Sequence, residues 1–203
     1  MELTSPLWTQ CLRAKVLLLG MEGSGKTTME KQMSDKERKL FDLEERQTVN
    51  HEAVGLFYEI GGRCSARPFW RSQIEGKAAL VFLIDSTDRK AFEPLRYEIM
   101  YACDHGAGSP LLILANKQDV EGACDVAEVI ESLDLESLNM RPMKQHQEEV
   151  EWRVFPCVAT TGEGVHAGFQ WLAETLWPER YGKCSLQATI SLNGWWSLLK
   201  PLL

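Results

Sequence analysis

A glycine-rich segment near the N-terminus has the residue types that a phosphate-binding loop needs. Residues 20–27 read Gly-Met-Glu-Gly-Ser-Gly-Lys-Thr and match the pattern G-x-x-x-x-G-K-[ST] in full. The glycines let successive backbone N–H groups point toward one centre, which makes a concave anion site at the start of a helix. Lys26 adds a positive charge for the β- and γ-phosphates, and the Thr27 hydroxyl is suited to Mg²⁺. The segment predicts a nucleoside phosphate site rather than an ordinary glycine turn.

A second polar segment, Asn-Lys-Gln-Asp at residues 116–119, indicates which base is bound. The Asp119 carboxylate suits guanine, whose N1–H and exocyclic amine both donate, whereas adenine would leave that charge unpaired. We expect Asn116 to bind the base N7 or to tie this loop to the phosphate loop, and the Lys117 stem to cover the ring face. Ala159-Thr160 follow a later strand, where a backbone N–H would read guanine O6.

Short apolar runs alternate with amphipathic stretches and predict the elements that position these loops. Continuous apolar runs suit strands that are covered on both faces, and apolar residues three and four apart suit helices. We expect an α/β fold: a mostly parallel six-stranded sheet flanked by helices. The predicted strands are 15–19, 56–60, 79–84, 111–115 and 153–158, and the predicted helices are 27–33, 90–102, 126–133 and 165–176.

The composition of the 203-residue chain limits its class. It is 44% hydrophobic and 25% charged, which is typical of a folded protein, and its net charge of −7 argues against general nucleic-acid binding. The apolar run 78–84 is too short to span a bilayer. Six cysteines without C-x-x-C pairs favour reduced thiols in a cytoplasmic protein and argue against zinc.

The pattern divides the chain into three parts: an N-terminal segment 1–14, a domain 15–177 and a tail 178–203. Apolar residues in the first part would allow a short amphipathic helix for a membrane surface, although packing on the domain is expected, and the tail is expected to be flexible or loosely docked. We see no secretory leader and no C-a-a-X box for prenylation. N-myristoylation needs a glycine at position 2, and this chain has Glu2 there. The charged segment 35–50 is expected to be a solvated helix face or a mobile loop.

The motifs, taken in order, resemble those of the small GTPases, and finer details resemble the ADP-ribosylation-factor-like (Arf/Arl) family. Gly61-Gly62 followed by Arg67-Pro68-Phe69-Trp70 resembles GGQ…RPLW of that family, and Trp70 and Phe69 are also typical of core packing. Residues 85–89 resemble its DS-x-DR turn, and residues 159–164 its A-T-S-G-D-G. The resemblance covers about Lys15 to Trp177 and implies a P-loop NTPase fold of the small-GTPase kind.

The resemblance also implies a function and its site. It implies a GTP/GDP switch with Mg²⁺, acting in membrane traffic or in ciliary or cytoskeletal regulation through effector, exchange and activating proteins, with peripheral membrane contact. It assigns the metal to Thr27 and Glu59. It assigns the nucleotide to Gly20, Glu22, Gly23, Ser24, Gly25, Lys26, Thr27, Thr28, Gly62, Asn116, Lys117, Asp119, Ala159 and Thr160.

Three departures from the family pattern bear on hydrolysis. Glu59 stands where the family has the Asp that holds a metal-bound water. Arg63 stands where it has the Gln that orients the attacking water, and a guanidinium has no acceptor for that purpose, although it can pair with phosphate. No Pro-Thr pair lies between Thr28 and Glu59, where Thr48 is the single threonine. Slow or impaired GTP hydrolysis is therefore expected, and no catalytic residue is assigned.

Two other classes of protein fit parts of the pattern. A pseudo-GTPase scaffold would keep the fold and hold guanine nucleotide permanently, or none, and the three departures favour it. A P-loop kinase or ATPase would keep the phosphate loop but prefer ATP. Assays of GTP hydrolysis and nucleotide exchange distinguish the scaffold from a switch. Base selectivity distinguishes a kinase or ATPase from a guanine-nucleotide-binding protein.

Overall fold

The computed structural model describes most of the predicted domain. The described residues are 16–33, 61–63, 65, 67–106, 108–139 and 150–176, together with the backbone of 47–49, 52–54 and 57–59. The predicted N-terminal segment, the tail and most of the charged segment lie outside these residues, so those three interpretations stay predictions.

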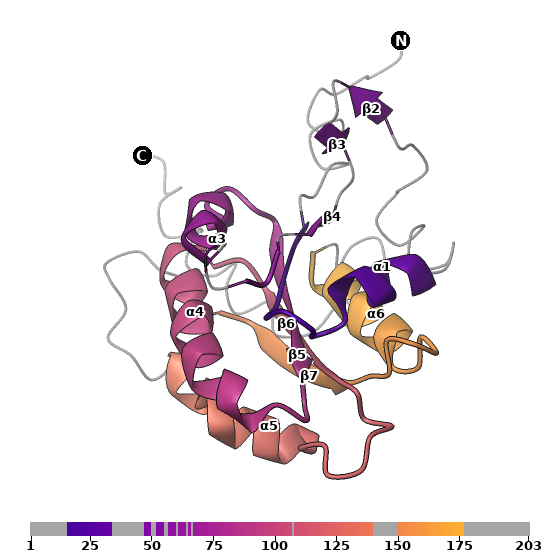
Figure 1. Cartoon of the computed structure of the whole chain (residues 1–203). Helices are drawn as coiled ribbons and strands as arrows, with labels where there is room; N and C mark the ends of the chain where they lie inside the picture. Colours follow the sequence, from indigo (N-terminus) through magenta and orange to yellow (C-terminus); the bar gives the residue numbers. More distant parts are fainter. Residues whose placement is uncertain are drawn as a thin grey trace, which may run out of the picture.

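A parallel sheet forms the centre of the fold (Figure 1). Its order is β4-β1-β5-β6-β7, and every neighbouring pair is parallel, which confirms the predicted sheet type. The described residues supply five strands to it, so the predicted count of six is not confirmed. The five are β1 (Val16–Leu19), β4 (Phe57–Glu59), β5 (Ala79–Asp85), β6 (Leu111–Asn116) and β7 (Trp152–Pro156).

A separate antiparallel pair precedes β4. It consists of β2 (Gln47–Val49) and β3 (Glu52–Val54). Thr48 lies in β2, paired with Ala53, so the last residues of the charged segment form a strand and not the predicted helix face or loop.

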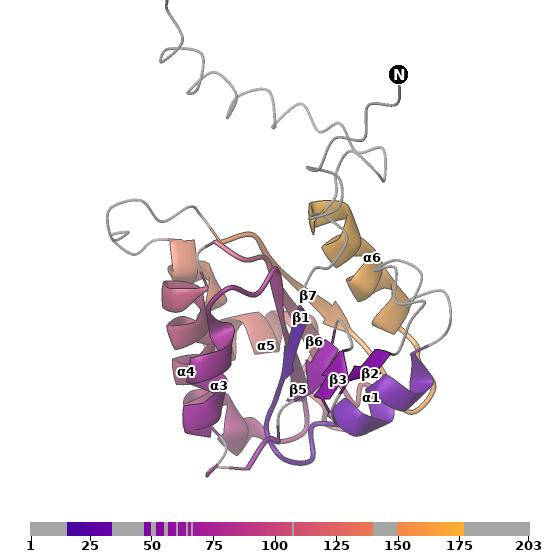
Figure 2. The same ribbon diagram turned by 90° about the horizontal axis from the view of Figure 1, so that it is seen from above.

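Helices cover both faces of the sheet, as predicted. In Figures 1 and 2, α1 and α6 lie on one face, and α3, α4 and α5 lie on the other. The helix α3 was not predicted from periodicity, whereas the other four agree with the predicted ranges to within a few residues. The helices are α1 (Lys26–Gln32), α3 (Arg67–Ile74), α4 (Phe92–His105), α5 (Val126–Leu133) and α6 (Val165–Leu176), with short 3-10 helices η3 (Arg89–Ala91) and η4 (Leu135–Asn139).

Alternation along the strands divides the apolar core into two clusters. Leu17 and Leu19 of β1 belong to the cluster under α3, α4 and α5, whereas Val16 and Leu18 belong to the cluster under α1 and α6. Successive side chains of a strand point to opposite faces, so an unbroken apolar run can fill both clusters. This packing holds the strand ends, and the loops that follow them, in fixed positions.

The start of α3 is attached to the loop that follows β4. Trp70 is 1% exposed, packs edge-on against Phe82 with ring centroids 6.3 Å apart, and donates from Nε1 to the Gly61 oxygen at 3.0 Å. Phe69 is 57% exposed, because the adjacent residue of a helix points about 100° away. The predicted core packing is therefore right for Trp70 and wrong for Phe69.

The described segments contain neither a membrane-spanning helix nor a disulfide-bonded cysteine. None of the helices in the described segments is long and apolar enough to cross a bilayer. Cys103, Cys124 and Cys157, the cysteines in the described part of the chain, are not in disulfide bonds.

Candidate functional site

The predicted site residues follow the carboxyl ends of neighbouring strands. The phosphate loop follows β1, Gly61 lies just beyond β4, Asp85 ends β5 and Asn116 ends β6. Because the strands are parallel, these ends meet at one edge of the sheet, where α/β folds bind their ligands. The sheet thus brings together loops that are far apart in sequence.

The phosphate loop folds around the side chain of Lys26. The Lys26 ammonium donates to the carbonyl oxygens of Gly20 and Met21 at 2.8 and 3.0 Å, and the residue is only 6% exposed. These two bonds hold the positive charge inside the curve of the loop. Thr27, the next residue, is exposed at the start of α1 and lines the same cavity as Lys26. Thr28 is exposed on α1 but does not line that cavity.

Gly25 is the point where the phosphate loop touches the base loop. Its φ of +99° is in the left-handed region that favours glycine. A Cβ at this position would lie 2.4 Å from Nδ2 of Asn116, so no side chain fits. The glycine pattern therefore has a tertiary cause as well as a local one.

Asn116 joins three loops. Its Nδ2 donates to the Ser24 oxygen at 2.7 Å, and its Oδ1 accepts from the Ala159 amide at 2.7 Å. The Cys157 thiol contacts the same Oδ1 at 3.8 Å, and burial raises the pKa of that thiol to about 12. Of the two roles predicted for Asn116, the structure shows the tie to the phosphate loop. Both polar groups of this side chain thus bind protein.

Lys117 is held by an acidic residue that was not assigned to the site from the sequence. Its ammonium pairs with the Asp85 carboxylate, which also accepts from the Thr87 amide at 3.0 Å and the Thr87 hydroxyl at 2.6 Å. Burial by itself raises the pKa of Asp85, but the bonds from Lys117 and Thr87 outweigh it, so the pKa is lowered. Lys117 also has a positive φ of 66°. The resemblance of residues 85–89 to a family motif was the available signal for Asp85.

Gln118 fixes the other side of the base loop. Its amide nitrogen donates to Ser86 Oγ at 2.9 Å and to the Cys124 oxygen at 3.0 Å, while its backbone N–H donates to the Cys157 oxygen at 3.3 Å. The backbone of the loop is therefore restrained on both sides of Gln118. The sequence identified Gln118 only as part of the motif.

Asp119 presents a carboxylate that has no partner among the described residues. It is exposed, and it makes no hydrogen bond or ion pair with any of the described residues. Among the residues after β7, the Ala159 amide already donates to Asn116, whereas the Thr160 amide has no acceptor within the described segments. Within the described part of the chain, the Thr160 N–H is thus unbonded, whereas the Ala159 N–H is used by Asn116. The Thr160 carbonyl accepts from Gln32 of α1 at 2.8 Å.

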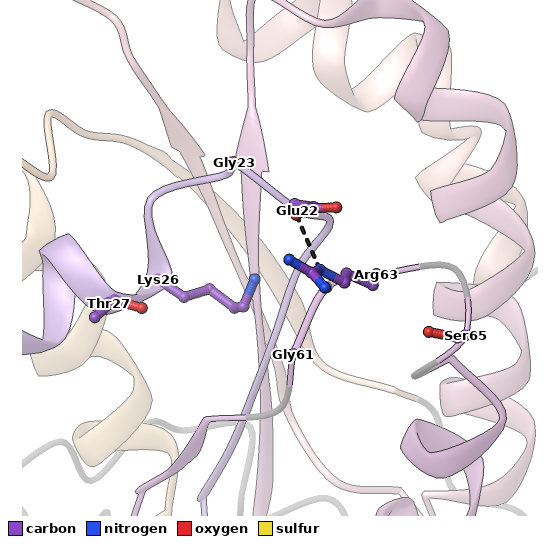
Figure 3. Close-up of a pocket in the computed structure, with 8 residues that line it drawn as sticks. Glu22, Gly23, Lys26, Thr27, Gly61, Arg63 and Ser65 are labelled. Atoms are coloured by element: carbon purple, nitrogen blue, oxygen red, sulfur yellow. Dashed lines mark hydrogen bonds and ion pairs between the residues drawn. The ribbon is translucent and has the colours of Figure 1, made fainter.

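A cavity of about 340 Å³ lies beside the phosphate loop (Figure 3). The loop after β4 closes one side of it: the Glu22 amide donates to the Gly62 oxygen at 3.2 Å. The Arg63 guanidinium reaches Glu22, with 3.2 Å between Nε and Oε1. Glu59 pairs in register with Leu18 at the end of β4, and its side chain lies outside the described residues. The lining residues are Glu22, Gly23, Lys26, Thr27, Gly61, Gly62, Arg63 and Ser65.

Comparisons with known proteins agree with this arrangement. The chain matches the ADP-ribosylation factor family over residues 2–176. It is 31% identical to ADP-ribosylation factor J of Dictyostelium discoideum over 173 residues, which cover 80% of this chain and 85% of that protein. It is 32% identical to ADP-ribosylation factor-like protein 3 of Chlamydomonas reinhardtii over 167 residues, covering 78% and 88%.

A solved structure extends the similarity to the fold. The Arl6 BBS3 small GTPase of Trypanosoma brucei, determined with the bound nucleotide analogue GppNp, superposes with a TM-score of 0.58 at 26% identity, covering 80% of this chain and 96% of that one. The α/β sheet, the P-loop and the sequence relatives point to the same group of GTP-binding proteins. The chain belongs to the ADP-ribosylation factor family of small GTPases.

Proposed function

We propose that this protein is a guanine-nucleotide switch that hydrolyses GTP slowly. The observation that carries the proposal is the position of Asn116, which binds the phosphate loop through Ser24 and the loop after β7 through Ala159. A nucleotide site needs its phosphate and base halves at a fixed separation, and this side chain supplies that link. The carboxylate of Asp119, which no residue in the described segments contacts by hydrogen bond or ion pair, lies three residues further along the same loop.

The phosphate half has the donors that a diphosphate or triphosphate requires. Lys26 is held by two carbonyls inside a loop whose glycines leave no room for a Cβ at Gly20 or Gly25. The Lys26 charge would pair with the phosphates, and a loop of this kind offers backbone N–H groups to an anion at the start of a helix. Bound Mg²⁺ would neutralise part of the phosphate charge. The Thr27 hydroxyl and Glu59 are the residues that would hold this ion.

The base half is suited to guanine. Asp119 would accept from N1–H and from the exocyclic amine, Thr160 N–H would donate to O6, and the Lys117 stem would cover the ring. Adenine has no donor at N1, so the carboxylate would stay unpaired in a complex with ATP. The proposed selectivity is therefore for GTP and GDP.

Nucleotide analysis tests this proposal directly. We expect heat to release GDP or GTP from the purified protein, and Asp119→Asn to shift the base preference from guanine toward xanthine. The matched control is Glu121→Gln, which removes an exposed negative charge two residues further on and should leave base preference unchanged. Unchanged selectivity in Asp119→Asn, or preferential binding of ATP, contradicts the proposal.

Slow hydrolysis rests on the residue at position 63. The Arg63 side chain has donors alone, so it cannot accept a hydrogen bond from an attacking water. We expect wild-type single-turnover hydrolysis to be slow and Arg63→Gln to accelerate it, because glutamine supplies an acceptor. A fast wild-type rate contradicts this part of the proposal while leaving guanine binding intact.

A second candidate function is a scaffold that binds nucleotide without switching. It is favoured by the attachment of α3 to α4, where Arg71 donates twice to Glu98, at 3.2 and 3.1 Å, and Glu98 is 7% exposed. This pair would resist movement of the helix that follows the cavity. Equal protection from hydrogen exchange in α3 with GDP and with a non-hydrolysable GTP analogue supports the scaffold, whereas a difference supports the switch.

The cellular setting is proposed from the family alone. We infer a cytoplasmic protein in membrane traffic or in ciliary or cytoskeletal regulation, in peripheral contact with a membrane, with effector, exchange and activating proteins as partners. Affinity capture with protein loaded with GDP or with a GTP analogue tests this setting. Partners that depend on the third phosphate are the expected outcome for a switch.

A further inference from the structure

Two charged side chains from different loops pair at the edge of the cavity. Glu22 belongs to the phosphate loop, and Arg63 belongs to the loop that follows β4. Their side chains are 66% and 77% exposed, and Nε lies 3.2 Å from Oε1. In Figure 3 the Arg63 side chain extends toward Glu22, while Lys26 reaches the cavity from the other side.

The backbone holds this pair together. The Glu22 amide donates to the Gly62 oxygen at 3.2 Å, so the residue before Arg63 is bonded to the phosphate loop. A Cβ on Gly62 would lie 2.3 Å from the Glu22 nitrogen, which shows how closely the two backbones approach. The backbone of Glu22 and the residue before Arg63 therefore lie in direct contact, which places the two side chains within reach of each other.

The charges of the pair act on whatever occupies the cavity. Lys26 and Thr27 line the same cavity, so the phosphate end of the proposed nucleotide would lie among these residues. An uncompensated Glu22 carboxylate would repel phosphate, and the repulsion would be greater for a triphosphate because it carries more negative charge than a diphosphate. The positive charge of the Arg63 guanidinium neutralises the negative charge of the Glu22 carboxylate in the ion pair.

We infer that Arg63 neutralises Glu22 and so prevents this carboxylate from lowering the affinity of the site for guanosine triphosphate relative to guanosine diphosphate. This inference rests on the proposed function, because it assumes a guanine nucleotide at the site. Arg63 acts through Glu22 as a specificity-determining residue, and loss of either charge changes the net charge beside the terminal phosphate. The charges that the two loops carry thereby affect the ratio of GTP affinity to GDP affinity.

Equilibrium titrations of GDP and of a non-hydrolysable GTP analogue in the presence of Mg²⁺ test the inference. Two opposite unit charges about 4 Å apart interact by about 1 kcal/mol in water, which is about fivefold in affinity. We therefore expect Arg63→Gln to lower the ratio of GTP-analogue to GDP affinity about fivefold, and Glu22→Gln to raise it about fivefold. The double variant should return toward the wild-type ratio, and each shift should shrink at high ionic strength.

Two further variants separate charge from structure. Arg63→Lys keeps the positive charge and should keep most of the wild-type ratio. Arg89→Gln removes one member of another exposed ion pair, Arg89–Glu128 at 3.1 Å, which is absent from the cavity lining and should leave the ratio unchanged. An effect of Arg63→Lys as large as that of Arg63→Gln would overturn the role of charge.

The outcomes distinguish this inference from the proposed function. If GDP binds all variants and the ratio does not change in either Arg63→Gln or Glu22→Gln, the inference is wrong and guanine binding stands. If the folded wild-type protein binds neither nucleotide, both are wrong. Circular dichroism melting accompanies each variant, and near-wild-type stability is expected because both side chains are exposed.

Discussion

The side-chain amide of Asn116 donates a 2.7 Å hydrogen bond to the carbonyl oxygen of Ser24, which lies 92 residues earlier in the chain. The same side chain accepts from the Ala159 amide, 43 residues later. Because Asn116 is only 2% exposed, these bonds are shielded from competing water. A single buried residue therefore keeps the two halves of the proposed nucleotide site in register.

Replacement of Asn116 should weaken both the fold and nucleotide retention. Asn116→Ala leaves a buried carbonyl and a buried amide without partners, and we expect the free energy of unfolding to fall by about 1–3 kcal/mol. Urea denaturation and the rate of GDP release measure the two effects. Gln170→Ala is the control, because it removes a side-chain bond to Glu174 on the exposed face of α6 and should change stability by less than about 0.5 kcal/mol. Equal effects of the two variants would contradict the role of Asn116.

Gly25→Ala should be more damaging than its backbone conformation alone explains. Gly25 and Gly76 both have positive φ values, 99° and 71°, but a Cβ would meet Asn116 at Gly25 and nothing within 4 Å at Gly76. We expect Gly76→Ala to destabilise the protein by about 1–2 kcal/mol, which is the cost of a left-handed alanine. Gly25→Ala should lose more than that and should also lose nucleotide affinity. Similar unfolding midpoints for the two variants would show that contact with Asn116 is unimportant.

The ion pair between Asp85 and Lys117 should make a pH-dependent contribution to stability. The pKa of Asp85 is lowered in the folded protein, so its contribution to stability is complete above the ordinary aspartate pKa of 3.8 and is lost as pH falls through the lower folded pKa. We expect Asp85→Asn to lower the free energy of unfolding by about 1–3 kcal/mol at neutral pH. The difference from wild type should narrow below about pH 4.

Denaturation of the two proteins across this pH range provides the measurement. Asp88→Asn is the matched control, since Asp88 is exposed and its carboxylate makes no bond with the described residues. A wild-type advantage over Asp85→Asn that stays constant to low pH would argue that the carboxylate charge is irrelevant.

Cys157 should resist alkylation in the native protein. It is 2% exposed, and burial raises the pKa of its thiol to about 12, so almost no thiolate exists near neutral pH. Pulsed labelling with iodoacetamide and mass spectrometry should show Cys103, which is partly exposed, reacting before Cys157. Asn116→Ala should accelerate labelling of Cys157, whose Sγ lies 3.8 Å from the Asn116 oxygen. Rapid labelling of Cys157 in the wild-type protein would contradict the buried environment.

Local patterns allowed most of the fold to be predicted. Apolar runs identified the strands of the parallel sheet, and helical spacing identified α4, α5 and α6, because these signals depend on neighbouring residues. The helix α3 was missed because its apolar side chains besides Pro68 are only Phe69, Trp70 and Ile74, two of them adjacent, so its helical spacing is weak. The exposure of Phe69 could not be predicted either, since one turn of α3 decides which aromatic residue faces Phe82.

The sequence by itself determined which functional groups are present: a phosphate loop at 20–27, a base loop at 116–119, and an arginine where the family has glutamine. Only the tertiary structure decided how those groups are used. In the structure Arg63 forms an ion pair with Glu22, and both polar groups of the Asn116 side chain form hydrogen bonds with the protein backbone. The carboxylate of Asp119 has no partner in the described segments. The physical reason is that a motif specifies residue types over a few positions, whereas hydrogen bonds and ion pairs depend on which strand ends the sheet places side by side.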